Sequence, residues 1–519
     1  MMNHDSLTLP QQFNFAQHIL ALNAQRAAKV AYIDDHTSIT YAELDRRVRS
    51  FAASLLARGI QPEQRVLLVM QDTVDLPVAL LGAMFAGVVP VPVNTLLHAA
   101  DYAYMIDHSR AKAVFASAPL LPCVREALAS SRNQPELIAC GAADDASLPH
   151  IDAMLAAAPL APDAHADTSA DDFAFWLYSS GSTGRPKGAV HSHANLFWTA
   201  ELYAKPILGI REDDIVFSAA KLFFAYGLGN GLTFPLSVGA TVVLMAERPT
   251  PAAVFARLTR HRPTVFAGVP TLYVAMLASP DLPPREQVAL RVCASAGEAL
   301  PREVGEAFRR HFGCDILDGL GSTEMLHIFV SNREGDVHYG SSGLPVPGYE
   351  IELRDEDNRP VAPGQIGDLY VRGPSAALLY WTNREKTRST FQGEWLKSGD
   401  KYSMDDGGYL TYAGRSDDML KVSGQYVSPI EVEAALSAHP AVLECAVVGK
   451  RDDTGLTKTA AYIVLRQGRQ PEHGLAEELK AFVKERLAPH KYPREMVFVA
   501  DLPKTATGKI QRYRLRDAA

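Results

Sequence analysis

The spacing of apolar residues in the N-terminal third of the chain alternates between the period of a helix and the continuous runs of buried strands. Thr40 and Glu43 have the spacing of a capping box, and Gly59 is placed to end the helix that they begin. The apolar residues of this helix share one face: Leu44, Val48, Phe51 and Leu55. The alternation continues with strands expected at 65–70, 88–93 and 113–116 and a helix at 78–86. This pattern predicts an α/β fold.

The longest stretch without charge, residues 76–93, approaches the length of a membrane span. Pro77, Pro90 and Pro92 interrupt it, and a proline inside a helix removes a hydrogen bond and clashes with the preceding turn. We therefore interpret the stretch as a buried helix that leads into a core strand. No membrane-spanning segment is expected.

Two changes of composition suggest how the chain is divided. Residues 141–172 are rich in Ala, Asp and Pro, which is typical of a surface connection between two α/β sub-structures. A second break falls at residues 414–418, after which Ser428 begins a capping box and a new helix. We predict a large N-terminal domain of α/β sub-structures, residues 1–416, and a small α+β C-terminal domain, residues 417–519.

The composition of the 519 residues is ordinary for a globular protein and excludes several classes of function. A net charge of −8 disfavours a nucleic-acid groove or an anionic membrane as the main partner. The five cysteines are scattered without a CxxC pair, so neither a disulfide framework nor a zinc site is indicated. The first residues, MMNHDSLTLPQQ, lack a signal-peptide pattern, and we expect a cytoplasmic protein with reduced thiols.

The strongest local signal is the sequence YSSGSTGRPKG at residues 178–188, which follows an apolar strand at 173–177. Glycines let backbone N–H groups approach a phosphate, hydroxyl groups donate hydrogen bonds, and Arg185 and Lys187 offset negative charge. The order differs from a Walker A loop, because Pro186 precedes the lysine and a glycine follows it. A flexible surface turn is the alternative, but so many ordered positions favour a phosphate-binding loop.

Several further motifs follow this loop: SAGE at 295–298, GSTE at 321–324, SGD at 398–400, GRSDD at 414–418 and PKTATGK at 503–509. In this order they resemble the motifs of the acyl-adenylate-forming superfamily, which includes the acyl-CoA synthetases, and the resemblance covers nearly the whole chain. It implies that the small C-terminal domain is mobile. It also implies a ligase that uses ATP and Mg²⁺ to convert a carboxylic acid into an acyl-AMP, and then transfers the acyl group to coenzyme A.

The resemblance assigns nucleotide-binding roles to residues of these motifs. Thr323 is expected at the α-phosphate and Glu324 at Mg²⁺, a cation that favours oxygen ligands; a helix cap is the alternative for Glu324. Asp400 is expected at the ribose, and Arg415 near the ribose and phosphate. The other expected nucleotide contacts are Ser179, Ser180, Gly181, Ser182, Thr183, Gly184, Lys187, Ala296, Gly297, Glu298, Asp318 and Gly319.

Lys509 is expected to be the lysine of the adenylation step, with Thr323 and Arg415 as the other catalytic residues. A carboxylate that attacks the α-phosphate brings two anions together, and a lysine between them stabilises the charge of the transition state. Because a thiol must later reach the same place, the small domain has to move between the two half-reactions, and Asp417 matches the hinge of the family. Gly424 matches the glycine beside which the pantetheine arm of coenzyme A passes.

The acid pocket is expected in two segments where the chain departs from the wider family. Phe224 stands where histidine is common, and Leu320 stands where an aromatic residue often precedes Gly321. The sequences KLFFAYGLGN and GSTEMLHIF resemble those of benzoate–CoA ligases, which implies an aryl carboxylate, with benzoate as the first choice. The residues expected to bind it are Phe224, Ala225, Tyr226, Gly227, His327 and Ile328. His327 either orients the carboxylate or packs in the pocket wall.

Two other functions stay open on the sequence. A free-standing adenylation enzyme would load a separate carrier protein, and a catalytically silent protein would only bind nucleotide, although the presence of Glu324 and Lys509 argues against the second. His191 and His193 are interpreted as loop residues rather than metal ligands, because no carboxylate or cysteine lies near them. The sequence does not indicate an oligomeric state.

Overall fold

The computed structural model describes residues 8–142, 147–179, 185–416, 419–422, 425–451, 457–466, 468–472, 474–487, 491–504 and 510–517. The chain divides into two compact units. Unit 1 contains Met1–Glu350 and Val371–Leu396, and unit 2 contains Ile351–Tyr370 and Lys397–Ala519. Strand pairing groups residues 351–370 and 397–415 with one another, so the unit boundary differs from a division at residue 416.

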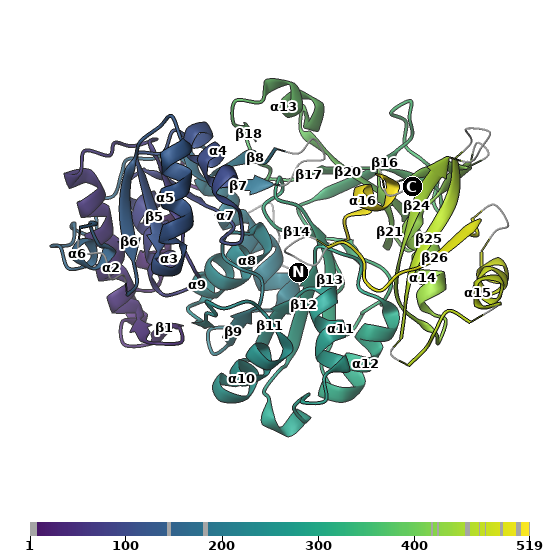
Figure 1. Cartoon of the computed structure of the whole chain (residues 1–519). Helices are drawn as coiled ribbons and strands as arrows, with labels where there is room; N and C mark the ends of the chain where they lie inside the picture. The colour runs from purple at the N-terminus through teal and green to yellow at the C-terminus, as the bar shows by residue number, and fades with distance from the viewer. Residues whose placement is uncertain are drawn as a thin grey trace. The chain divides into compact units, whose positions relative to one another are not determined.

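The N-terminal part of unit 1 contains a four-stranded parallel sheet (Figure 1, purple to blue). Its order is β4-β3-β5-β6, with β3 (Arg65–Val69), β4 (Val89–Pro92), β5 (Ala113–Ser117) and β6 (Glu136–Cys140). The helices of this part are α2 (Tyr41–Ala57), α3 (Asp75–Phe85), α4 (Ala99–Ser109), α5 (Leu121–Ser130) and α6 (Ile151–Leu155), with a 3₁₀ turn η3 (Ala118–Leu120). Parallel strands need crossover connections, and the alternating helices supply them.

Helices α2 and α3 confirm the predicted pattern. Thr40 and Glu43 form the capping box at the start of α2, and the four apolar residues predicted to share a face are fully buried. Within α3 the side chains from Leu76 to Phe85 are buried, as expected for a core helix. The two helices approach closely at Gly82, where an added Cβ would lie 2.8 Å from the ring of Phe51.

Residues 141–172 contain an element that their composition did not predict. The short helix α6 buries three apolar side chains, Ile151, Met154 and Leu155. It packs on α2, and the Ser54 hydroxyl donates a hydrogen bond to the Met154 carbonyl at 3.1 Å. The apolar spacing i, i+3, i+4 is the signal for a helix face, but it spans too few residues to stand out among alanines.

A nine-stranded sheet forms the other main layer of unit 1, with the order β15-β14-β13-β12-β11-β9-β10-β1-β2. In Figure 1 its strands β9 and β11 are teal, and β1 is purple. The strands from β1 to β13 in this order are parallel, whereas β2, β14 and β15 run antiparallel to their neighbours. Their bounds are β1 (Val30–Ile33), β2 (Ser38–Thr40), β9 (Ile215–Ser218), β10 (Thr241–Val243), β11 (Val265–Gly268), β12 (Val292–Ala296), β13 (Ile316–Gly321), β14 (Ile328–Ser331) and β15 (Leu344–Pro345).

The helices that follow or precede these strands are α1 (Phe15–Leu22), α7 (His193–Thr199), α8 (Ala225–Leu228), α9 (Phe234–Val238), α10 (Pro251–His261), α11 (Pro270–Ala278) and α12 (Arg302–Phe312). Two π-helical segments, η4 (Ala200–Leu208) and η5 (Gly229–Thr233), and two 3₁₀ turns, η2 (Ala24–Arg26) and η6 (Arg285–Gln287), complete this part. Such π segments occur frequently at functional sites.

A small antiparallel sheet, β18-β8-β7, carries the ends of the expected phosphate loop. It consists of β7 (Phe173–Ser179), β8 (Lys187–Ser192) and β18 (Leu379–Tyr380), and α13 (Arg384–Thr390) and β19 (Phe391–Gln392) follow β18. Trp176 of β7 and Val190 of β8 are fully buried in one cluster with Val91 and Val114 of the four-stranded sheet. This shared core fixes the hairpin on a rigid support.

Unit 2 contains most of a five-stranded sheet, a three-stranded sheet and a two-stranded hairpin. The first sheet has the order β16 (Glu350–Arg354), β17 (Ile366–Arg372), β20 (Trp395–Met404) and β19, and β21 (Leu410–Arg415) also pairs with β20. The second has β24 (Val442–Arg451), β25 (Thr457–Leu465) and β26 (Glu495–Phe498), beside the hairpin of β22 (Leu420–Val422) and β23 (Gln425–Val427). The helices of unit 2 are α14 (Pro429–Ser437), α15 (Leu475–Lys484) and α16 (Arg512–Asp517). Ser428 accepts a hydrogen bond from the Glu431 N–H, which confirms the predicted start of α14.

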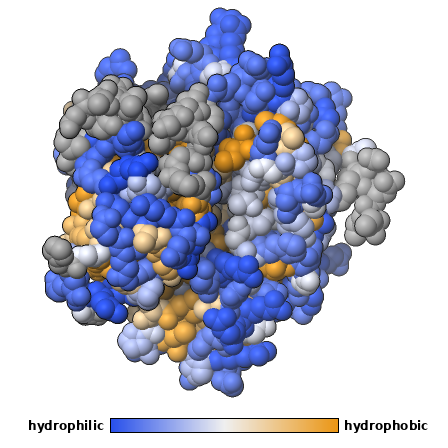
Figure 2. All heavy atoms as spheres, turned by 90° about the vertical axis from the view of Figure 1, so that its right-hand side faces the viewer, coloured by the Kyte–Doolittle hydropathy of each residue, from blue (hydrophilic) through white to orange (hydrophobic). Residues whose placement is uncertain are grey.

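The fold class agrees with the sequence-based prediction. The structure is a mixed α/β protein with a larger N-terminal and a smaller C-terminal part. Among the described residues, no helix has both the length and the apolar character needed to cross a membrane. Hydrophilic residues dominate the face drawn in Figure 2, with apolar residues in separate patches. The exposed large apolar side chains are Leu22, Leu56, Leu96, Val274, Ile366, Leu378 and Leu443.

Candidate active site

The expected phosphate loop joins the two strands of the β7–β8 hairpin. Ser179 and Lys187 are the register partners that flank the loop, so both ends of the loop are fixed by strand pairing. The expected nucleotide contacts Ser180, Gly181, Ser182, Thr183 and Gly184 lie outside the described residues and stay predictions.

Glu324 lies beside this loop end of the hairpin. The Ser179 hydroxyl donates a hydrogen bond to Glu324 Oε1 at 3.2 Å, and the Tyr380 hydroxyl donates to the same oxygen at 2.7 Å. The Lys187 ammonium lies 4.7 Å from the centroid of the Tyr380 ring, within reach of a cation–π interaction. The structure therefore brings together three residues that the motifs predicted and a fourth, Tyr380, that sequence reasoning missed. Tyr380 stands in the apolar run ALLYW, where nothing marks it as polar-site chemistry.

The turn that carries Thr323 and Glu324 is held by hydrogen bonds to three successive carbonyls. His191 Nε2 lies 2.8 Å from the Thr323 carbonyl oxygen, the Ala377 N–H donates to the Glu324 carbonyl at 2.7 Å, and the Ser375 hydroxyl donates to the Met325 carbonyl at 2.8 Å. No helix begins at Glu324, since the chain passes from β13 through this turn to β14, so a helix-cap role does not apply.

His191 and His193 are not loop residues, and that interpretation is wrong. His191 belongs to β8 and His193 is the first residue of α7, and both side chains are fully buried. Burial lowers the pKa of His191 to about 3 and that of His193 to about 4, so both rings are neutral near pH 7. Among the described residues, no group of three His, Cys, Asp or Glu side chains is placed to hold a metal ion.

Five of the expected nucleotide contacts lie at or just after the ends of two neighbouring strands. Ala296 ends β12 and is the register partner of Gly319 in β13, and Asp318 pairs with the preceding residue of β12. Gly297 has φ +96°, which favours glycine, and Glu298 is half-buried beside it. Parallel strands place their carboxyl ends at one edge, where α/β proteins commonly bind ligands.

Asp318 and Gly319 are neighbours in β13 with different properties: Asp318 has a raised pKa, and Gly319 packs closely on β14. Burial raises the pKa of Asp318 to about 7, although hydrogen bonds from its surroundings act in the opposite direction. An added Cβ at Gly319 would lie 2.8 Å from the Val330 carbonyl oxygen of β14, so a side chain does not fit there. The strand end combines close backbone packing with a carboxyl group that titrates near neutral pH.

The two expected acid-binding segments meet in unit 1. Phe224 precedes α8, which begins with Ala225 and Tyr226, and the ring of His327 stacks on that of Tyr226 with centroids 5.5 Å apart. His327 Nε2 lies 3.2 Å from the Tyr226 carbonyl oxygen, and Phe234 packs edge-on against the imidazole at 4.4 Å. Burial lowers the pKa of His327 to about 3, so the ring is neutral. Aromatic packing around His327 is thus observed directly.

Several buried polar atoms of this region have no hydrogen-bond partner within the described part of the chain, among them His327 Nδ1 and the Tyr226 hydroxyl. A buried polar group without a partner costs free energy unless a water or ligand satisfies it. Gly227 is required by packing, because an added Cβ would lie 2.0 Å from the Lys221 carbonyl oxygen. Ile328 is buried at the start of β14. The segment therefore combines tight backbone packing with buried polar atoms that have no partner among the described residues.

Asp72 is a second residue that sequence reasoning missed. Its Oδ2 atom accepts a hydrogen bond from the Leu222 N–H at 3.1 Å, and the side chain is buried. Burial raises the pKa of Asp72 to about 6, and the nearby Lys221 ammonium partly offsets this effect. The contact ties the loop after β3 to the segment that carries the expected acid-binding residues. A lone aspartate after an apolar strand gives no sequence signal for this role.

Unit 2 contains the expected ribose-binding pair. Asp400 of β20 and Arg415 of β21 are register partners, and Arg415 Nη1 lies 3.0 Å from Asp400 Oδ1. The backbone N–H of Asp400 donates to the Ser398 hydroxyl at 3.0 Å, and Gly399 has φ +79°. The side chains of the SGD and GRSDD motifs are thus brought together. Lys509, Asp417 and Gly424 lie outside the described residues, so their roles stay predictions.

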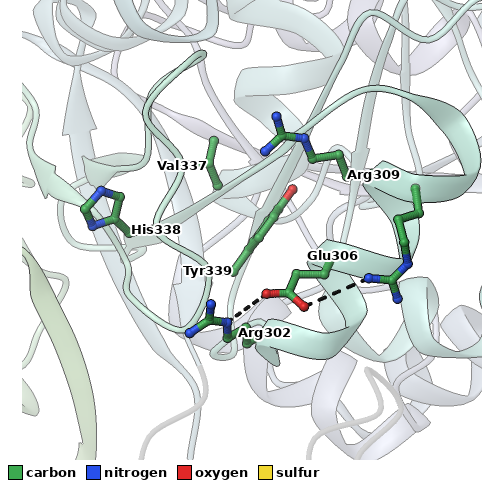
Figure 3. Close-up of a pocket in the computed structure, with 7 residues that line it drawn as sticks. Arg302, Glu306, Arg309, Val337, His338 and Tyr339 are labelled. Atoms are coloured by element: carbon green, nitrogen blue, oxygen red, sulfur yellow. Dashed lines mark hydrogen bonds and ion pairs between the residues drawn. The ribbon is translucent and has the colours of Figure 1, made fainter.

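A surface hollow of about 540 Å³ beside α12 does not coincide with this site (Figure 3). Its lining residues are Arg302, Glu306, Arg309, Arg310, Val337, His338 and Tyr339. Glu306 accepts a hydrogen bond from Arg302 at 2.8 Å and lies 4.0 Å from Arg310, so it offsets part of the positive charge. The guanidinium groups point in different directions in Figure 3, and none of the expected site residues lines the hollow.

Comparison with known proteins agrees with the motifs and the fold. The AMP-binding enzyme family matches residues 21–381, and the C-terminal domain of AMP-binding enzymes matches residues 431–509. The chain belongs to the AMP-binding enzyme family. This confirms the superfamily expected from the phosphate loop and the motifs that follow it.

Similar proteins include several aryl–CoA ligases. The benzoate–CoA ligase of Thauera aromatica is 57% identical over 517 residues, which cover 99% of this chain and 97% of that protein. The 4-hydroxybenzoate–CoA/benzoate–CoA ligase of Rhodopseudomonas palustris is 48% identical over 95% of this chain and 91% of that protein. The crystal structure of a benzoate CoA ligase from Burkholderia xenovorans LB400 is 64% identical, with a TM-score of 0.91, and covers 97% of this chain and 100% of that one.

Proposed function

We propose that the chain is an AMP-forming acid–thiol ligase that joins benzoate, or a closely related aryl carboxylate, to coenzyme A through an aryl-adenylate. The observation that carries the proposal is the convergence of Ser179, Lys187, Tyr380 and Glu324 at the loop end of the β7–β8 hairpin. The turn of Glu324 continues directly into His327 and Ile328 of the expected acid pocket. Similarity to aryl–CoA ligases over almost the full chain supports the same function.

ATP binds with its phosphates over the hairpin in this proposal. Lys187 and the hydroxyl groups of the loop offset and orient the phosphate oxygens, and Thr323 contacts the α-phosphate. Magnesium, held by Glu324 when bound, would offset the charge of the phosphates. The ends of β12 and β13, from Ala296 to Glu298 and at Asp318 and Gly319, cradle adenine. Asp400 and Arg415 bind the ribose and phosphate.

The acid lies between the phosphates and the aromatic wall. Phe224, Ala225, Tyr226 and Ile328 form a compact, largely apolar pocket for a flat ring, closed at one end by the packing of Gly227. His327 is neutral and stacked, so it acts through its shape and through the unpartnered Nδ1 atom, which accepts a hydrogen bond. The wall leaves the carboxylate as the polar end of the ligand, which faces the nucleotide.

Two half-reactions follow. A carboxylate oxygen of the acid attacks the α-phosphorus of ATP, a new P–O bond forms, and diphosphate leaves, while Lys509 offsets the charge between the two anions. The thiol of coenzyme A then loses its proton and attacks the acyl carbon, and AMP leaves with the oxygen that joined it to the acyl group. Gly424 lets the pantetheine arm approach the backbone, and residues 417–519 move relative to residues 1–416 about Asp417. Residues 382–430, which lie between the two matched family regions, include this boundary.

An assay with benzoate, ATP, Mg²⁺ and coenzyme A tests the proposal. We expect equal amounts of AMP and benzoyl-CoA, and a panel of aromatic and aliphatic acids should favour benzoate. Replacing Lys509 with alanine should slow the adenylation step by roughly 10²- to 10³-fold, because a preorganised charge contact to the transition state is lost. Lys480→Ala is a matched control, since Lys480 lies in α15 of unit 2, outside the motifs, and forms an ion pair with Glu477.

Two results would contradict the proposal in different ways. Benzoate-dependent AMP formation without a thioester, in the presence of coenzyme A, would favour the free-standing adenylation enzyme that loads a carrier protein. Normal adenylation by the Lys509→Ala protein would remove the assigned role of that lysine. A cytoplasmic location is part of the proposal and is tested by fractionation of the source cells.

A further inference from the structure

A buried hydrogen-bond chain leads from helix α7 to the turn of Thr323 and Glu324. The Ser192 hydroxyl donates to Asn195 Oδ1 at 3.0 Å, and Asn195 Nδ2 lies 3.0 Å from His191 Nδ1. His191 Nε2 lies 2.8 Å from the Thr323 carbonyl oxygen. The imidazole is also stacked on the ring of Phe175 in β7, with centroids 5.1 Å apart and planes 15° apart. All of these residues lie in unit 1.

One assignment of the protons satisfies every donor and acceptor of this series of hydrogen bonds. A carbonyl oxygen accepts hydrogen bonds only, so His191 Nε2 must carry the proton that it donates to Thr323. The neutral ring then has its lone pair on Nδ1, which accepts from the Asn195 amide, and the second amide hydrogen is donated to the Ala376 carbonyl at 3.0 Å. Burial, which lowers the pKa of His191 to about 3, keeps the ring neutral over the whole range of ordinary assays.

The turn that receives this hydrogen bond is strained. Leu326, two residues after Glu324, has φ +65°, a left-handed conformation that is uncommon for a residue with a branched side chain. Its side chain is nevertheless buried in the main core of unit 1. A strained backbone persists only where surrounding contacts hold it, and here the carbonyls of Thr323, Glu324 and Met325 are each held by a different group.

We infer that His191 and Asn195 are positioning residues, which hold the turn of Thr323 and Glu324 in the conformation that presents both side chains to the phosphates of MgATP. The inference rests on the proposed function, because it assigns ATP phosphates to this turn. His191 touches no substrate; it acts through the Thr323 carbonyl. Asn195 fixes the tautomer of His191. It also donates to the Ala376 carbonyl, and the N–H of the next residue, Ala377, donates to the Glu324 carbonyl.

The neighbouring His193 offers a matched control. It is as fully buried as His191, but its Nδ1 atom accepts a hydrogen bond from the Phe15 N–H at 3.2 Å, at the first residue of α1. Replacing either histidine with leucine removes a buried imidazole of similar size from the same segment. Only the replacement of His191 leaves the Thr323 carbonyl without its donor. The pair therefore separates a general loss of packing from a specific loss of turn geometry.

The experiment compares His191→Leu with His193→Leu by calorimetric binding of MgATP to the full chain, and by the KM values for MgATP and benzoate. We expect His191→Leu to weaken MgATP binding roughly five- to 100-fold, because a buried carbonyl loses its partner, and to change the KM for benzoate much less. His193→Leu should lower the melting temperature and leave MgATP affinity within about twofold. His191→Gln, which keeps a side-chain N–H donor, should recover part of the lost affinity.

Equal effects of the two leucine variants on MgATP, or unchanged MgATP affinity in His191→Leu, would overturn the inference. If His191→Leu does not fold, Asn195→Ala tests it instead. Loss of the Asn195 donor should weaken MgATP binding, and nitrogen chemical shifts of His191 should show mixed tautomers in place of the Nε2–H form. If His191 of the wild-type protein carried its proton on Nδ1, the assigned direction of its hydrogen bonds would be contradicted. Binding of MgATP without formation of benzoyl-AMP by the wild-type chain would refute the proposed function alone.

Discussion

Burial decides the charge of several single residues around the candidate site. His191 and His327 are held neutral because their pKa values fall to about 3, whereas burial raises the pKa of Asp318 to about 7. The histidines therefore offer fixed donors and acceptors at any ordinary pH. Asp318 is different, because it changes charge within the physiological range.

The raised pKa of Asp318 predicts a specific dependence of stability on pH. A carboxyl group with a higher pKa in the folded state favours the folded protein in its protonated form, so stability falls as pH rises from about 4 to about 7. Asp318→Asn removes this penalty without changing the side-chain shape. We expect the melting temperature of the variant, relative to the wild type, to be higher at about pH 8 than at about pH 5.

Asp357→Asn, at an exposed aspartate of unit 2, serves as the control for this measurement. The melting temperatures of Asp357→Asn and the wild type should differ little at both values of pH. If the melting temperatures of the wild type and Asp318→Asn differed by the same amount from acid to alkaline pH, the pKa of Asp318 would not be raised.

The sequence predicted the residues of the site better than the contacts between them. The motifs placed Ser179, Lys187 and Glu324 in one site, and the structure brings these three side chains together. Tyr380 and Asp72 were missed because their roles depend on partners far away along the chain: 56 residues for Tyr380 and Glu324, and 150 for Asp72 and Leu222. No local pattern records such a contact. The interpretation of the buried histidines as loop residues failed for the same reason.

At the scale of elements, local signals for helix ends were the most reliable. The capping box of α2 and the N-cap of α14 are both present, since each depends on residues three positions apart. The helix α6 and the π-helical segments η4 and η5 were not foreseen. Their form depends on packing against other elements, which periodicity alone does not contain.

The capping box of α2 gives a prediction at this scale. Thr40→Ala leaves the Glu43 N–H without its side-chain acceptor, and we expect a loss of about 1 kcal/mol in the free energy of unfolding, measured with urea. Thr37→Ala is the control, because Thr37 is exposed and precedes the helix. Equal stabilities of the two variants would show that the cap does not contribute to the stability of unit 1.

For the whole molecule, the proposed ligase needs its C-terminal part to change position between the half-reactions. We predict that Asp417→Pro, which fixes φ at the proposed hinge, leaves benzoyl-AMP formation within a few fold and slows thioester formation by about tenfold or more. Single-turnover assays with and without coenzyme A measure the two steps separately. An unchanged second half-reaction would count against the hinge.

Asp406→Pro provides a matched control for the hinge variant. Asp406 lies in a turn in which the Gly408 N–H donates to the Asp405 carbonyl at 3.0 Å, and proline is favoured at its position of such a turn. This variant should therefore leave both half-reactions unchanged. Slower thioester formation in both variants would show that the loss is not specific to Asp417.

The pairing of Ser179 with Lys187 limits how the phosphate loop can change in length. Deleting one residue between them would force either a tighter connection or a slip of one strand by a single position. In an antiparallel pair such a slip turns every side chain of that strand to the opposite face. Lys187 would then leave the Tyr380 ring, and buried Val190 would exchange places with its neighbours. Variants of this enzyme should therefore tolerate substitutions in the loop more readily than insertions or deletions.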